Sequence, residues 1–73
     1  MKFFEWEIEM NPKMKPYMDM ENRRVAILTK EDDEIHMTME LDEQDRLVFH
    51  PRWNCNVILL GEKHIRLTLN QED

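Results

Sequence analysis

The strongest constraint on the fold of this chain is a two-residue rhythm of apolar and polar side chains. Residues 35–41 carry isoleucine, methionine, methionine and leucine at every second position, and residues 65–69 repeat the pattern with isoleucine and two leucines. Successive side chains point to opposite faces of a β-strand, whereas this spacing on a helix would spread the apolar residues around the axis. Both segments are therefore predicted to be strands with one buried and one solvated face.

Four more segments are predicted to be strands, at residues 3–10, 23–30, 46–50 and 57–60. The run 57–60 is apolar at consecutive positions, which is typical of a strand covered on both faces. In the first segment the spacing assigns Phe4, Trp6, Ile8 and Met10 to the buried face. Residues 11–22 contain two prolines and are interpreted as a long connection. The expected fold is all-β, a small antiparallel barrel or sandwich of about five to six short strands, and the alternative is a split sheet with one short helix near residues 16–22.

The length of 73 residues allows a single small β domain spanning residues 1–73. A chain of this size buries only a small core, which excludes a nucleotide-binding α/β domain with its own substrate pocket. The hydrophobic fraction is 41% and the charged fraction 36%. Since the apolar residues are ordered in alternation rather than scattered, folding is favoured over disorder.

The formal net charge of −6 favours protein partners with a basic surface. It disfavours general affinity for nucleic acid or for anionic membranes. No apolar stretch is long enough to span a bilayer, and the N-terminal residues have acids where a secretory signal carries its apolar centre. Because Cys55 is the only cysteine, no disulfide is expected. We therefore expect a cytoplasmic protein with no membrane partner.

Acidic residues gather in two places that could dock a basic partner. Three alternate on one face of the first predicted strand, and residues 31–45 hold eight acids with no lysine or arginine. The alternative for both is a solvated face that protects a strand edge. Tyr17 and Trp53 are candidate apolar anchors, since aromatic residues dominate binding hot spots. The candidate partner-binding acids are Glu5, Glu7, Glu9, Asp32, Asp33, Glu34, Glu40, Asp42 and Glu43.

Catalytic motifs are missing from the sequence. With Gly61 as the single glycine, no phosphate-cradling loop or nucleophile elbow can form. Cys55 near His50 could suggest an activated thiol, or a zinc site with His36 and His64, but a structural zinc site needs four ligands that are usually close cysteine pairs. We therefore predict no enzyme, no cofactor and no metal site.

Cations and aromatic residues interleave at one place, Arg46, Phe49, Arg52 and Trp53. On a small barrel this stretch could bind RNA or single-stranded DNA, although Phe49 is also in phase with the core. Four methionines around Tyr17 are read either as gap filler or as an adaptable surface.

The leading functional hypothesis is a non-enzymatic interaction module. It is expected to bind, and to regulate or inhibit, a protein such as a nucleic-acid-handling machine with a basic surface. The alternative is the small nucleic-acid-binding barrel. An open strand edge could also pair with a second copy, so a homodimer is expected.

Overall fold

The computed structural model describes residues 1–52 and 55–69, and all regular structure in these ranges is β. The all-β prediction is therefore confirmed, with eight strands instead of five to six. The strands are β1 (Lys2–Phe3), β2 (Trp6–Met10), β3 (Met14–Asp19), β4 (Arg24–Thr29), β5 (Ile35–Leu41), β6 (Leu47–Pro51), β7 (Cys55–Gly61) and β8 (His64–Leu69).

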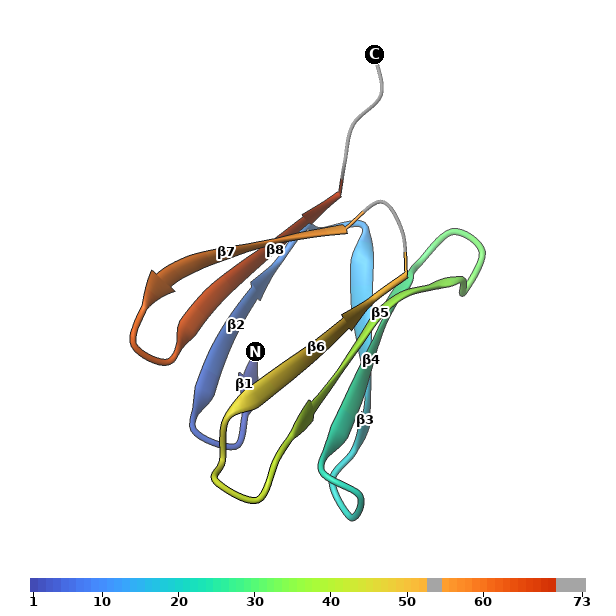
Figure 1. Cartoon of the computed structure of the whole chain (residues 1–73). Coiled ribbons are helices and arrows are strands. Elements are labelled where there is room, and N and C mark those ends of the chain that lie inside the picture. Colours follow the sequence, from blue (N-terminus) through green and yellow to red (C-terminus); the bar gives the residue numbers. More distant parts are fainter. Residues whose placement is uncertain (53–54, 70–73) are drawn as a thin grey trace.

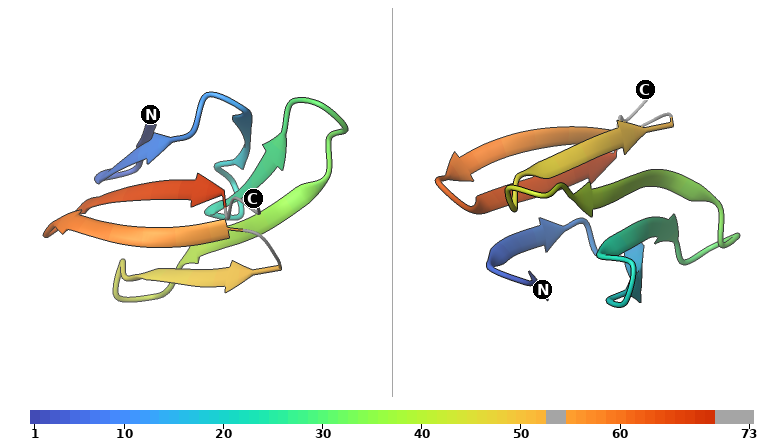
Figure 2. Two further views of the ribbon diagram at one scale, coloured as in Figure 1. Left: turned by 90° about the horizontal axis from the view of Figure 1, so that it is seen from above. Right: turned by 60° about the horizontal axis from the view of Figure 1, so that its bottom comes forward.

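The strands form two four-stranded sheets, in the orders β1-β2-β8-β7 and β3-β4-β5-β6 (Figure 1). All neighbouring strands are antiparallel except β2 and β8, which run parallel. The predicted antiparallel sandwich is confirmed, and among the described strands this one pair departs from the antiparallel pattern. The β2–β8 pair joins the N-terminal hairpin to the C-terminal hairpin. The two sheets lie against each other as a small sandwich (Figure 2).

The core lies between the sheets and is formed mainly by the inward faces of their central strands, with Phe3 of β1 and Met14 of β3 added from end strands. Met37, Met39, Ile65 and Leu67 are fully buried, as the two-residue rhythm predicts. Of the methionines around Tyr17, Met14 is buried while Met18 and Met20 are exposed. Among the residues that the structure describes, the buried apolar ones are Phe3, Ile8, Met14, Val25, Ile27, Met37, Met39, Leu41, Ile65 and Leu67, and His36 is buried and polar.

Residues 14–19 form strand β3, so the short helix near residues 16–22 is not present. Pro16 lies in this strand without breaking it, because β3 is the end strand of its sheet and a proline there need not donate to a second neighbour. A turn follows, in which the Asp19 carboxylate accepts hydrogen bonds from the side-chain and backbone nitrogens of Asn22 at 2.8 and 3.3 Å. The connection predicted at residues 11–22 is therefore mostly strand and turn.

The first predicted strand is broken by a hairpin turn at Phe4. Its φ of 56° lies in the left-handed region, which reverses the chain between β1 and β2. Phe3 is consequently the fully buried ring and Phe4 is 41% exposed. Assigning Phe4 to the core face is wrong, because a turn residue interrupts the two-residue period.

Strand β7 is an end strand of its sheet, so the prediction that residues 57–60 are covered on both faces is wrong. Ile58, Leu59 and Leu60 are all exposed, and Leu59 retains 72% of its accessible surface. The other boundaries differ from prediction by one or two residues, within the usual range for strand ends.

Candidate functional site

Of the predicted acidic strip, Glu7 and Glu9 lie on the outer face of the β1-β2-β8-β7 sheet, whereas Glu5 lies in the turn between β1 and β2. Glu5 forms an ion pair with Lys63, and Glu7 lies 3.1 Å from the N-terminal amino group. Glu9 accepts hydrogen bonds from His64 at 2.7 Å and from Arg66 at 3.1 Å. These two hydrogen bonds lower the pKa of the Glu9 carboxyl below its usual value, and the bond with His64 is the larger cause. Each acid of the strip is therefore compensated within the molecule.

The β5–β6 turn uses its acids to hold its own backbone. The Asp42 carboxylate accepts backbone N–H groups from Arg46 at 2.8 Å and Gln44 at 2.9 Å, and it pairs with the Arg46 guanidinium. The Arg46 backbone donor is the main cause of the lowered pKa of Asp42. Asp45 pairs with Arg23, whereas Glu43 has no ion pair within the described ranges. Asp42 is thus a turn-stabilising residue.

The turn between β4 and β5 forms the acidic tip, defined here as residues 31–34. The Thr29 hydroxyl and the Glu34 backbone N–H both donate hydrogen bonds to the Asp32 carboxylate. These bonds lower the pKa of Asp32, and the bond from Thr29 is the larger cause. Asp33 pairs with Lys15. Glu31 and Glu34 have no ion pair in the part of the chain that the structure describes. The tip therefore keeps negative charge available to a partner.

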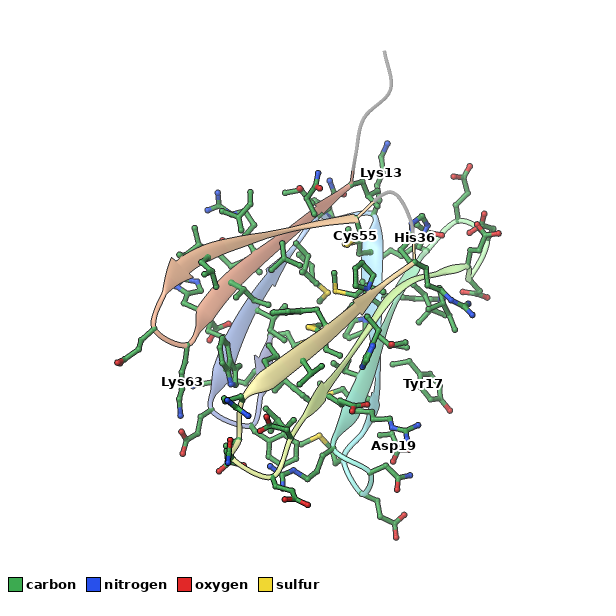
Figure 3. All side chains as sticks on the ribbon, in the orientation of Figure 1. Lys13, Tyr17, Asp19, His36, Cys55 and Lys63 are labelled. Atoms are coloured by element: carbon green, nitrogen blue, oxygen red, sulfur yellow. The ribbon has the colours of Figure 1, made fainter. Side chains whose placement is uncertain are left out.

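Tyr17 is the most exposed aromatic side chain in the described ranges, with 71% of its surface accessible. It projects from the outer face of the β3-β4-β5-β6 sheet (Figure 3). In the register of that sheet, Tyr17 is opposite Ala26, which is opposite Thr38. Because Ala26 has the smallest side chain of this row, the face is hollowed beside the tyrosine ring.

Tyr17 separates two shallow depressions of this outer face. The first, about 280 Å³, is lined by Tyr17, Asp19, Arg24, Val25, Ala26, Thr38, Met39 and Glu40. The second, about 460 Å³, is lined by Lys15, Pro16, Tyr17, Leu28 and Asp33. We call this surface the Tyr17 face.

Charges frame the Tyr17 face at both ends. Arg24 lies 3.8 Å from Glu40, which is also 3.8 Å from His50. Asp19 stands at the same end, and the Asn22 side chain that donates to it is the main cause of its lowered pKa. The Lys15–Asp33 pair and the acidic tip lie toward the other end. The face thus combines an aromatic ridge with carboxylates on either side.

The candidate nucleic-acid-binding residues do not come together on one surface. Arg46 precedes β6 and pairs with Asp42, whereas Arg52 follows its other end and donates its backbone N–H to the His36 carbonyl at 2.9 Å. Phe49 is half-buried against the core, opposite Met39. Trp53 lies outside the described residues.

The cysteine and histidines are spread over both sheets. His50 faces Glu40 in one sheet and His64 faces Glu9 in the other. Cys55 is half-buried, and burial raises the pKa of its thiol, so the thiol stays protonated at neutral pH. Among residues 1–52 and 55–69, no three groups of ligating type lie together as a metal site.

Arg24, Ala26 and Thr38 of the Tyr17 face were not anticipated from the sequence. The one available signal was the alanine within the apolar run 25–28, because a small residue among large ones leaves a depression. The pairing of β3 with β4 could not be anticipated, since residues 14–19 lack a two-residue rhythm.

Comparison with known proteins finds no matching family model, curated protein or solved structure. No helix in the described part of the chain is long and apolar enough to cross a membrane.

Proposed function

We propose that this chain is a non-enzymatic protein-binding module that recognises its partner through the Tyr17 face. The partner presents an apolar group to the depressions beside Tyr17 and basic groups to the surrounding carboxylates. Occupying a basic surface of the partner, such as one that handles nucleic acid, regulates or inhibits that partner. A lone cysteine fits a cytoplasmic location for this activity.

The observation that carries the proposal is the exposure of Tyr17 between two depressions. Tyrosine supplies a large, rigid contact area and a hydroxyl, and it is enriched among residues that dominate binding energy. A depression on each side allows a partner to enclose both faces of the ring. Excluding water around an anchor in this way is a property of hot spots.

Electrostatics supports a basic partner at this face. The acidic tip supplies Glu31 and Glu34 without ion pairs among the described residues, and Asp19 stands at the opposite end. Complementary charge at the rim accelerates association and selects against acidic partners. Glu5, Glu7 and Glu9 are less suited to this role, because each already has a cationic partner.

Protein binding is favoured over nucleic-acid binding because of the positions of the cationic and aromatic groups. Arg46 is held by Asp42, and Phe49 packs against the core, so neither is presented for phosphate contact or base stacking. The Tyr17 face, by contrast, carries more acidic than basic side chains and would repel phosphates.

Selection from a displayed library of random peptides tests the proposal. Peptides selected on the wild-type chain should be enriched in lysine, arginine and apolar residues. Tyr17→Ala should weaken their binding by about 30-fold, the level expected for a hot spot of about 2 kcal/mol. Tyr17→Phe is the matched control and should retain most of the affinity because it keeps the ring.

Charge variants complete this test. Glu31→Gln with Glu34→Gln should lower the association rate and reduce its dependence on salt. Selected peptides that bind Tyr17→Ala as tightly as wild type, or whose affinity does not fall as salt rises, would contradict the proposal.

A further inference from the structure

Strand β7 is an end strand that lacks the usual protection against pairing with another chain. It extends over seven residues, contains no charged residue and no proline, and pairs only with β8 among the described residues. The other end strands are guarded: β1 has two residues, β3 contains Pro16 with Lys15 and Asp19, and β6 ends at Pro51. Charges, prolines and short length are three of the features by which proteins prevent edge pairing, and β7 has none of these three. Its one register shift against β8 lies near the end of the strand, between Leu59 and Gly61.

Apolar side chains along β7 are uncovered on both faces of its sheet. Leu59 pairs in register with the buried Ile65 and so lies on the inner face, yet it is 72% exposed. Ile58 pairs with Arg66 on the outer face and is also exposed. An inner-face leucine with this exposure shows that the core of the sandwich ends before the sheet does.

We propose that β7 pairs antiparallel with β7 of a second copy of this chain, which joins two four-stranded sheets into one eight-stranded sheet. A two-fold axis at Ile58, the middle residue of the strand, sets Ile58 opposite its own mate. Val57 of one copy is then opposite Leu59 of the other on the inner face. Every central pair is apolar, and such cross-strand pairs are the unit of sheet stabilisation.

The distribution of charge favours a second copy as the occupant. A strand without charge offers nothing to select a charged foreign segment, but it meets its own copy without opposing like charges. Lys63 in the β7–β8 turn and Arg66 on β8 are each paired with a glutamate, Glu5 and Glu9 respectively. The acidic residue Glu62 directly follows β7 but lies in the turn, outside the strand. The acidic tip belongs to the other sheet, and most of the net negative charge of the described residues lies on residues 11–52, which form that sheet.

The size of the contact predicts a weak dimer. Seven strand residues span about 24 Å, and a sheet is about 10 Å thick, so the strip covers well under the roughly 800 Å² per partner of a stable complex. Association is therefore expected in the micromolar range or weaker. Raising the salt concentration should leave it unchanged or strengthen it, because the residual long-range repulsion between two acidic molecules is screened.

Sedimentation equilibrium from 1 μM to 1 mM tests the assignment, with the dilution range chosen from the micromolar scale of affinity. Wild type should show reversible dimerisation. Leu59→Lys should raise the dissociation constant at least tenfold, since it adds two like charges at the edge. Met20→Lys, which makes the same change at an exposed site beside the other sheet and outside the Tyr17 face, should leave the constant within about twofold of wild type.

Cross-linking tests the register directly. In a Cys55→Ala background, Ile58→Cys places two thiols opposite each other across the axis, within the Cα separation of 4.4–6.8 Å that a disulfide needs. Mild oxidation should convert this variant to covalent dimer. Asn56→Cys in the same background is the control, because two copies of position 56 are about 14 Å apart along the strand.

The proposal is overturned if wild type remains monomeric up to 1 mM, a concentration at which even a weak dimer is populated. It is also overturned if Met20→Lys disrupts the dimer as much as Leu59→Lys does, or if position 56 cross-links as readily as position 58. These outcomes do not bear on the Tyr17 face, because that face lies on the other sheet and its own test compares peptide binding by wild type and Tyr17→Ala.

Discussion

Two neighbouring phenylalanines give the sharpest test of the fold, because the turn at Phe4 leaves Phe3 in the core and Phe4, which was predicted to be buried, partly exposed. Phe3 is fully buried, and replacing a buried phenylalanine by alanine typically costs about 3–5 kcal/mol. A chain of 73 residues has a total stability of about 4–11 kcal/mol. Phe3→Ala should therefore remove a large share of the stability and leave a fraction of the molecules unfolded in water.

Replacing Phe4 should cost less stability than replacing Phe3. Its ring is 41% exposed and contacts the Phe3 ring edge-on at 5.0 Å and the Arg23 guanidinium at 5.8 Å. Together these contacts are worth about 1–2 kcal/mol. Phe4→Ala should cost about that amount. Phe4→Gly should recover about 1 kcal/mol of it, since glycine adopts the left-handed φ of 56° without strain.

Urea unfolding at low micromolar protein, followed by tryptophan fluorescence, measures all three variants under conditions that suppress self-association. The slope of unfolding free energy against urea should stay constant across the series. If Phe4→Ala costs as much as Phe3→Ala, or if Phe4→Gly is less stable than Phe4→Ala, then β1 and β2 are one continuous strand with Phe4 in the core, and the described turn is refuted.

Three further predictions concern pH and turns. Stability should fall as the pH drops from about 5 to 3, because carboxyls such as Glu9 and Asp42 have lowered pKa values and the unfolded chain binds more protons there; a urea midpoint that does not change with pH would contradict this. Asp42→Ala should lower the urea midpoint through loss of the turn bonds, whereas Glu43→Ala should not; equal midpoints would argue against the turn role. Gly61→Ala should leave stability unchanged or raise it by up to about 1 kcal/mol, since φ is not positive and the added Cβ would lie 3.5 Å from His64 Cβ; thermal unfolding that shows a clear loss would contradict it.

Local alternation predicted which side chains are buried wherever a strand runs uninterrupted. Residues 37, 39, 41, 65 and 67 are buried as expected, because period two is a property of the backbone and needs no knowledge of neighbours. At the strand ends the pattern departs from the prediction, since His36 is buried while Ile35 and Leu69 are half-buried. The prediction that Phe4 is buried is wrong for a physical reason, because a turn residue in the left-handed conformation shifts the two-residue period by one. Nothing in its identity as phenylalanine indicates this conformation.

The order of the strands in each sheet could not be predicted from the sequence. This order decides which acidic side chains are free to bind a partner. Whether Glu9 is free or paired depends on β8 lying beside β2, a parallel contact between residues more than fifty positions apart. The apolar run 57–60 suggested a central strand, since periodicity does not distinguish a covered strand from an uncovered edge. The Tyr17 face could not be predicted for the same reason, because it depends on the pairing of β3 with β4, which places the Tyr17 ring beside Ala26.

The two proposed surfaces lie on different sheets, so using one does not block the other. A dimer formed through β7 would carry two Tyr17 faces and could engage two sites on one surface. Linked binding of this kind raises apparent affinity by about 10²–10⁴ without any new contact. Leu59→Lys should then weaken binding to densely immobilised partner while leaving the affinity for a single soluble peptide unchanged. If wild type and Leu59→Lys bind densely and sparsely immobilised partner with equal apparent affinity, the β7 edge and the Tyr17 face act independently.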